Sequence, residues 1–108
     1  MAASKRSTQA TAFAALGDET RLLLVTRLAA GRRCSISQLT RGSKLTRQAI
    51  SKHLRVLEDI GMVRGVKTGR ENLFELRPQP IVGIREYLDL VSRQWDEALL
   101  RLKSFVEQ

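Results

Sequence analysis

Residues 36–59 constrain the fold most, because they carry two short helical patterns joined by a glycine-containing turn. Ser35 precedes the first pattern and Gln38 lies three residues on, which is the spacing of a capping box. Gly42 follows this pattern as a stop signal, and Thr46 stands where the second helix needs a cap. Two capped helices with so short a turn predict a helix-turn-helix.

The second of these helices is amphipathic. Apolar residues recur on it at helical spacing and predict a buried stripe: Ala49, Ile50, Leu54 and Leu57. The opposite face is polar and basic, without an acidic residue: Arg47, Gln48, Ser51, Lys52 and Arg55. Arginine and lysine suit guanine acceptors, glutamine can pair with adenine, and serine can bond a base edge or a phosphate. The pattern therefore predicts a major-groove surface, with an ordinary solvated helix face as the alternative.

The charge is concentrated around this motif. The chain has a net charge of +8, and residues 41–70 hold eight basic and two acidic side chains, a net +6. From residue 71 onward the balance is acidic, with seven acidic and five basic side chains. Ribosomal and membrane-surface proteins can also be basic, but double-stranded DNA accounts for the motif as well as for the charge.

The chain of 108 residues has the length of one domain, and we expect residues 1–108 to form it, with about the first eight frayed. The single cysteine excludes an intrachain disulfide framework, and no apolar run has the length of a membrane helix. The short apolar stretch 10–16 is interrupted by Thr11 and followed by Gly17 and Asp18, so it does not predict a signal peptide. We expect a cytoplasmic protein without a membrane partner.

Two helices are predicted before the motif. Residues 9–16 form a short helix that ends at Gly17, and Asp18 caps the next helix, which runs to about Gly31. The expected buried face of the second helix is Leu22, Leu23, Val25, Leu28 and Ala29. Its arginines, Arg21 and Arg27, are expected to be solvated.

A β-hairpin is predicted after the motif. Residues 62–76 contain two β-leaning segments around a turn at residues 68–70. On the second strand Phe74 and Leu76 can face inward, whereas Gly65 weakens the first strand. The tip carries two basic residues, Lys67 and Arg70, which suits a wing that reaches a DNA backbone or minor groove. An exposed loop with solubilising charge is the alternative.

The last helical pattern spans residues 79–107. Its apolar positions alternate at spacings of three and four: Ile81, Ile84, Leu88, Val91, Trp95, Leu99, Leu102 and Val106. A helix of this length is about 40 Å long, which exceeds what so small a domain can cover. We therefore expect the stripe from Leu88 to Leu102 to contact a second copy of the chain. Trp95 could instead line a ligand pocket.

Residues 13–28, 36–63 and 68–76 together resemble the ArsR/SmtB family of winged-helix repressors, over nearly the whole chain. The resemblance rests on ALGDETR at residues 15–21 and on a Ser-x-His-Leu-x-x-Leu-x-x-x-Gly-x-Val spacing: Ser51, His53, Leu54, Leu57, Gly61 and Val63. It implies a mainly α fold with a two-stranded β-wing, and a homodimeric repressor of a palindromic operator. Its first and last helices would form the dimer interface: Phe13, Leu16, Leu88, Val91, Trp95, Leu99 and Leu102. The family's base-reading positions fall on Arg47, Gln48, Ser51 and Lys52.

The chain departs from the best-known members of that family in its metal ligands. Those members place cysteines near the first motif helix, or histidines with carboxylates on the last helix. Here Cys34 stands alone, and the last helix has no histidine, although Asp89, Asp96 and Glu97 could form a weak oxygen site. We expect no metal and no cofactor. Cys34 is interpreted as an apolar staple residue, and His53 as a packing residue or a phosphate contact.

The chain offers no converging acid, base and nucleophile and no glycine-rich phosphate loop, so an enzyme is not expected. Two other classes stay open. A protein-interaction module would lack salt-dependent retention on duplex DNA. A redox-responsive repressor would lose oxidant-induced release in Cys34→Ser. The predicted DNA contacts are Thr46, Arg47, Gln48, Ser51, Lys52, His53, Arg55, Lys67 and Arg70.

Overall fold

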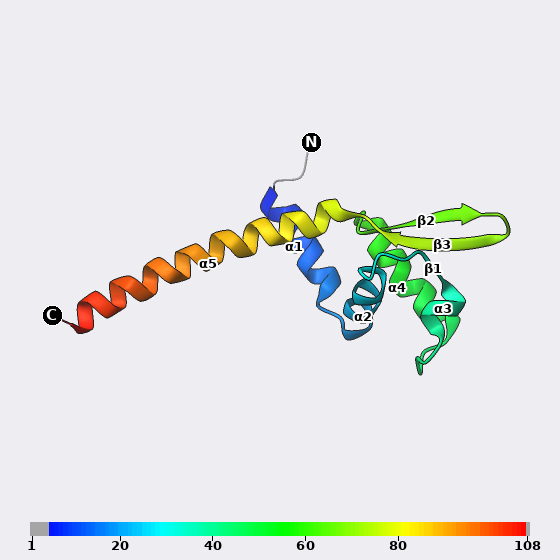
Figure 1. The fold of residues 1–108 in the computed structure, drawn as a ribbon, viewed down its shortest axis with the longest axis horizontal. Helices are drawn as coiled ribbons and strands as arrows, with labels where there is room; N and C mark the ends of the chain where they lie inside the picture. Colours follow the sequence, from blue (N-terminus) through cyan, green and yellow to red (C-terminus); the bar gives the residue numbers. More distant parts are fainter. Residues whose placement is uncertain (1–4, 108) are drawn as a thin grey trace.

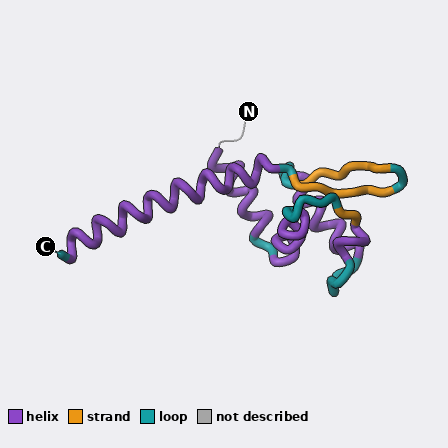
Figure 2. Tube along the Cα trace, viewed as in Figure 1, coloured by secondary structure: helices purple, strands orange, loops and turns teal. Residues whose placement is uncertain are grey.

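The computed structural model describes residues 5–107, which form a helical body with a β-wing and a long C-terminal helix that projects from it (Figure 1). The elements in order are α1 (Lys5–Leu16), α2 (Glu19–Leu28), β1 (Cys34–Ser35), α3 (Ile36–Thr40), α4 (Arg47–Asp59), β2 (Val63–Thr68), β3 (Glu71–Leu76) and α5 (Pro78–Val106). The molecule measures 68 × 38 × 21 Å, and α5 accounts for its elongation (Figure 2). The predicted mainly α winged helix-turn-helix is confirmed.

Helix α1 begins earlier than the sequence indicated. Fraying was predicted for about the first eight residues, but residues 5–8 are helical, and residues 1–4 lie outside the described part. The first turns are held by α5, because Lys5 pairs with Glu86 at 3.3 Å and the Gln9 amide donates to the Gly83 carbonyl at 3.3 Å. The prediction was wrong because these contacts join residues more than 70 positions apart, which local sequence patterns do not indicate.

The buried face of α2 was predicted wrongly in part. Leu24, Val25 and Leu28 are buried, whereas Leu22 and Leu23 are about half exposed and Ala29 is exposed. Residues 24, 25 and 28 share one side of a helix by their spacing, and this side packs against α4. The other leucines flank that side, because the body covers α2 from one direction only.

The core lies where α2, α3, α4 and the sheet meet. As predicted, α4 contributes Ile50, Leu54 and Leu57, each no more than 1% exposed, whereas Ala49 of the predicted stripe is only half-buried. Met62 and Val63 follow α4 and are also buried, because the Gly61 turn, with φ of 76°, directs the chain back across the body.

The sheet has three antiparallel strands in the order β1-β3-β2. The predicted hairpin is present, with Val63 paired with Leu76 and Gly65 with Phe74. Gly69, with φ of 62°, takes the first central position of its two-residue turn, as in a type II′ turn. The two-stranded prediction missed β1, whose Cys34 pairs with Phe74, since two residues carry no strand pattern of their own.

Helix α5 has nearly its predicted span, and only its start is covered by the body. Ile84 is buried, and the Tyr87 ring meets Phe13 of α1 edge-to-face with centroids 5.6 Å apart. Farther along, Leu88, Trp95, Leu99 and Leu102 are 51–64% exposed. In residues 5–107, no helix combines the length and apolarity needed to cross a membrane.

Candidate nucleic-acid interface

The first motif helix, α3, is fixed by the predicted capping box. The Ser35 hydroxyl accepts a hydrogen bond from the Gln38 backbone N–H at 3.2 Å, and the Gln38 side chain accepts one from the Ser35 N–H at 2.8 Å. Gly42, with φ of 79°, turns the chain after α3 ends. Together these contacts fix the direction in which the chain enters α4.

Helix α4 begins at the predicted cap. The Thr46 hydroxyl accepts a hydrogen bond from the Ala49 backbone N–H at 3.1 Å, so it completes the first turn of the helix. Burial of the apolar stripe of α4 in the core leaves its polar face in solvent. The orientation of this face therefore follows from packing on the far side of the helix.

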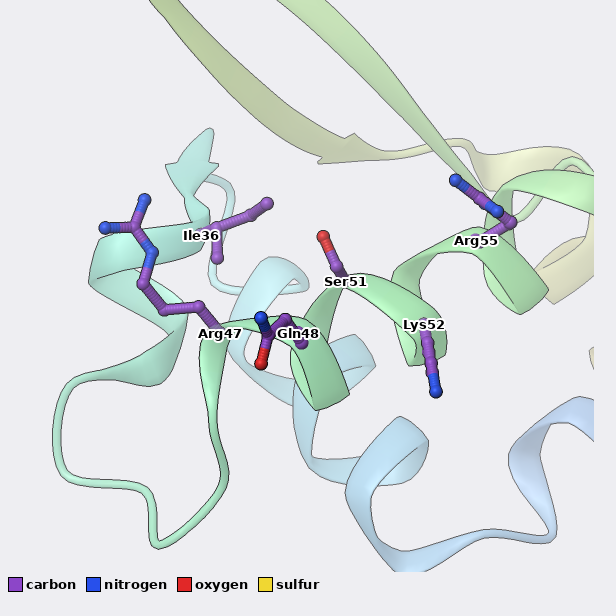
Figure 3. Close-up of a pocket in the computed structure, with 6 residues that line it drawn as sticks. All are labelled: Ile36, Arg47, Gln48, Ser51, Lys52 and Arg55. Carbon is purple, nitrogen blue, oxygen red and sulfur yellow. The ribbon is translucent and has the colours of Figure 1, made fainter.

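The polar face of α4 lines an open groove of about 440 Å³ (Figure 3). We call its six residues the reading face: Ile36, Arg47, Gln48, Ser51, Lys52 and Arg55. The five polar members come from α4, as predicted, and the structure brings them together. Ile36 was missed, because only the packing of α3 against α4 brings the start of α3 to this groove. In residues 5–107, no acidic side chain forms a salt bridge with the basic members.

His53 does not line this groove, and it faces the start of α2 instead. Its Nδ1 lies 3.3 Å from Nη1 of Arg21 and 3.7 Å from Oδ2 of Asp18. Asp18 caps α2 by accepting from the Arg21 N–H at 3.0 Å. This N–H, and then the charges of His53 and Arg21, lower the pKa of the Asp18 carboxyl.

The two arginines of α2 were predicted to be solvated, but both are half-buried and hydrogen-bonded to neighbouring helices. Arg21 donates through Nε to the Ala15 carbonyl at 2.7 Å, and its Nη1 is directed at His53. Arg27 donates to the Leu39 carbonyl at 2.8 Å, which ties α2 to α3. Both guanidiniums donate to backbone carbonyls at the ends of neighbouring helices. Helical periodicity in the sequence does not indicate such contacts.

The wing carries the predicted basic tip, with Lys67 and Arg70 exposed at the end of the hairpin. Its base is held by Glu75 of β3, which accepts from Nε of Arg33 at 2.8 Å and from Nε of Arg64 at 2.5 Å. Arg33 and then Arg64 hold the pKa of Glu75 below its usual range. In the described part of the chain, no carboxylate forms a salt bridge with Arg70 at the tip, whereas Arg33 and Arg64 at the base pair with Glu75.

Cys34 is half-buried in β1 and packs against the core, in keeping with a staple residue. Its thiol lies 3.8 Å from the Arg32 carbonyl oxygen. Across residues 5–107 the structure groups no three His, Cys, Asp or Glu side chains that could hold a metal ion.

Comparison with known proteins identifies the family. A model described as a helix-turn-helix domain matches residues 16–66. The HTH-type transcriptional regulator Rv2034 of Mycobacterium tuberculosis is 35% identical over 88 residues, which cover 82% of this chain and 78% of that protein. An ArsR-like transcriptional regulator from Rhodococcus sp. RHA1 is 34% identical, with a TM-score of 0.77 and 93% of each chain covered.

A third similarity is to the fold. The homodimeric winged helix-turn-helix domain of Mb0332 from Mycobacterium bovis, a possible ArsR-family regulator, is 20% identical with a TM-score of 0.62, and the match covers 86% of this chain and 82% of that chain. The names of the relatives, the winged fold and the basic groove on α4 all indicate a DNA-binding regulator. The chain belongs to the ArsR family of winged helix-turn-helix proteins and is a DNA-binding transcriptional regulator.

Proposed function

We propose that the protein is a homodimeric repressor that binds a palindromic operator, with α4 in the major groove and the wing beside it. The observation that carries this proposal is the reading face, a groove lined by five exposed side chains with hydrogen-bond donors and by Ile36. Within residues 5–107, no acidic side chain pairs with its basic members. Arg47 and Gln48 lie on the first turn of α4, which is the end that enters the groove in this motif. The proposed DNA contacts are Thr46, Arg47, Gln48, Ser51, Lys52, Arg55, Lys67 and Arg70.

His53 is left out of this set, because its Nδ1 faces Arg21 and Asp18. The Thr46 hydroxyl already accepts the Ala49 N–H as a cap, so in its proposed DNA contact it donates its O–H to an acceptor on the DNA.

The homodimer is supported by the apolar stripe of α5 that the body leaves uncovered. Leu88, Trp95, Leu99 and Leu102 lie on one side of the helix and are more than half exposed. The homodimeric state of Mb0332, which shares the fold, agrees with this arrangement. The proposed interface joins α1 and α5: Phe13, Leu16, Leu88, Val91, Trp95, Leu99 and Leu102.

A dimer with twofold symmetry presents two equivalent α4 helices, so its operator is expected to be palindromic. The half-sites should be centred about 34–36 Å apart, one turn of DNA, or a multiple of this distance. Binding over a promoter would exclude the polymerase. The proposed cellular location is the cytoplasm.

The proposed repressor does not respond to metal. Asp89, Asp96 and Glu97 project from an exposed helix, and neither a thiolate nor an imidazole accompanies them there. Micromolar zinc and a chelator should both leave the operator affinity unchanged, as measured by fluorescence anisotropy. A stoichiometric metal in the purified protein, whose removal changes that affinity, would contradict this part of the proposal.

The test of DNA binding is retention on duplex DNA at several salt concentrations, followed by footprinting on the DNA adjoining the gene. Counterion release requires that affinity fall steeply with salt, with a log–log slope of about 0.9 per neutralised phosphate. A protected palindrome together with this slope would support the proposal. Salt-independent binding, or none, would favour a protein-interaction module.

A further inference from the structure

We infer that Arg21 and His53 are positioning residues for DNA recognition, joined in a contact that we call the Arg21–His53 latch. It connects the end of α1, the start of α2 and the middle of the recognition helix α4. The inference rests on the proposed reading face, and it adds residues that touch no DNA.

The geometry of the latch depends on the two directions of the Arg21 guanidinium. Nε donates to the Ala15 carbonyl at the end of α1 at 2.7 Å, and Nη1 lies 3.3 Å from Nδ1 of His53. A guanidinium is a planar donor with several fixed N–H directions, so one side chain can hold both elements at once. A lysine has one terminal nitrogen on a flexible stem and cannot reproduce this planar bridge.

The contact requires an acceptor on the imidazole. Arginine only donates, so Nδ1 accepts in this contact, as it can in the tautomer that carries the ring hydrogen on Nε2. Asp18 lies 3.7 Å from the same nitrogen, which is beyond hydrogen-bond distance. The described charged groups at the ring are Arg21 and Asp18, both from the start of α2.

His53 and the polar members of the reading face lie on the same helix, so the latch can affect how that face is oriented. His53 lies between Ser51 and Lys52 on one side and Arg55 on the other along the chain, yet it faces away from the groove that these residues line. Rotation of α4 about its axis would move His53 and the reading face together. The latch therefore adds a polar contact to the core packing of α4, and it couples the rotation of the reading face to α1, which is a proposed dimer helix.

The test measures the ratio of operator affinity to random-DNA affinity in four variants. His53→Leu removes the acceptor, and Arg21→Lys removes the planar donor while it keeps the charge. Each should lower the ratio by about threefold to tenfold, with little change on random DNA. His53→Gln retains an acceptor and should preserve most of the ratio. Gln48→Ala reports on the reading face itself.

Arg21→Lys decides the question if His53→Leu fails to fold, because it alters the other partner of the contact and keeps the charge.

The outcomes separate the latch from the reading face. If Gln48→Ala lowers the ratio while His53→Leu and Arg21→Lys do not, the latch is refuted and the reading face stands. If Gln48→Ala has no effect, the reading face itself is wrong. If His53→Leu weakens operator and random DNA equally and lowers the salt slope, His53 is a phosphate contact, and the positioning role is refuted.

Discussion

Helices α4 and α5 are both amphipathic, yet they present opposite faces to solvent. On α4 the apolar residues Ile50, Leu54 and Leu57 are at most 1% exposed, and the polar face is free. On α5 only the start is covered, and Trp95 and Leu99 are 64% and 57% exposed. The exposed face indicates the kind of partner: a polyanion suits the donors of α4, whereas another apolar surface suits α5.

The strongest test of this comparison is to place a charge on the α5 stripe. A symmetric interface would contain Leu99→Glu twice and desolvate two carboxylates, so the dimer dissociation constant should rise by roughly a factor of 100 or more. Sedimentation velocity would measure the loss of dimer. Leu100→Glu is the matched control, because Leu100 is 66% exposed but lies roughly opposite the stripe. An unchanged Leu99→Glu dimer would remove α5 from the interface.

The next effect should appear on the reading face. Gln48→Ala and Arg47→Ala each remove donors from the first turn of α4, and each should cost about 1–3 kcal/mol on the operator and relax sequence preference. Binding isotherms on operator and scrambled duplex measure this loss. Gln94→Ala and Arg101→Ala on α5 remove the same side-chain types elsewhere, and they should leave discrimination unaltered.

The wing should behave differently from the reading face. If Arg70 neutralises a phosphate, Arg70→Ala should weaken operator and random DNA alike and lower the salt slope by about one unit for each subunit that loses its contact. Isotherms at several salt concentrations measure the slope. A loss confined to the operator would instead show that the wing reads sequence.

The smallest effect concerns the base of the wing. The pKa of Glu75 is lowered in the folded protein by Arg33 and Arg64, so the unfolded chain binds the proton more readily. The stability that this carboxylate contributes is therefore present above the usual glutamate pKa of about 4.3 and is lost as the pH falls through the folded value. Between about pH 6 and about pH 3, the thermal unfolding temperature should decline less steeply for Glu75→Gln than for the wild type. If the two proteins show parallel curves of unfolding temperature against pH, solvent screens the Arg33–Glu75 and Arg64–Glu75 pairs too strongly for them to stabilise the fold.

The sequence predicted what depends on local spacing. The caps at Asp18, Ser35 and Thr46, the buried stripe of α4 and the hairpin around Gly69 all arise from residues a few positions apart. Tertiary contacts account for the differences: the early start of α1, the strand β1 and the place of Ile36 in the groove. Arg21 and Arg27 donate to the carbonyls of Ala15 and Leu39, which lie six and twelve residues away in the sequence. Helical periodicity does not identify such acceptors.

The contact between α1 and α5 also affects the order in which the chain can assemble during synthesis. Gln9 of α1 bonds to Gly83 of α5, 74 residues later, and Lys5 pairs with the still later Glu86. The helices α2, α3 and α4 and the hairpin all precede α5, so the DNA-reading body can form while α1 still lacks these partners. Helix α1 can dock on α5 only after the ribosome has synthesised α5. The event that completes the monomer thus also supplies the apolar stripe through which two monomers meet.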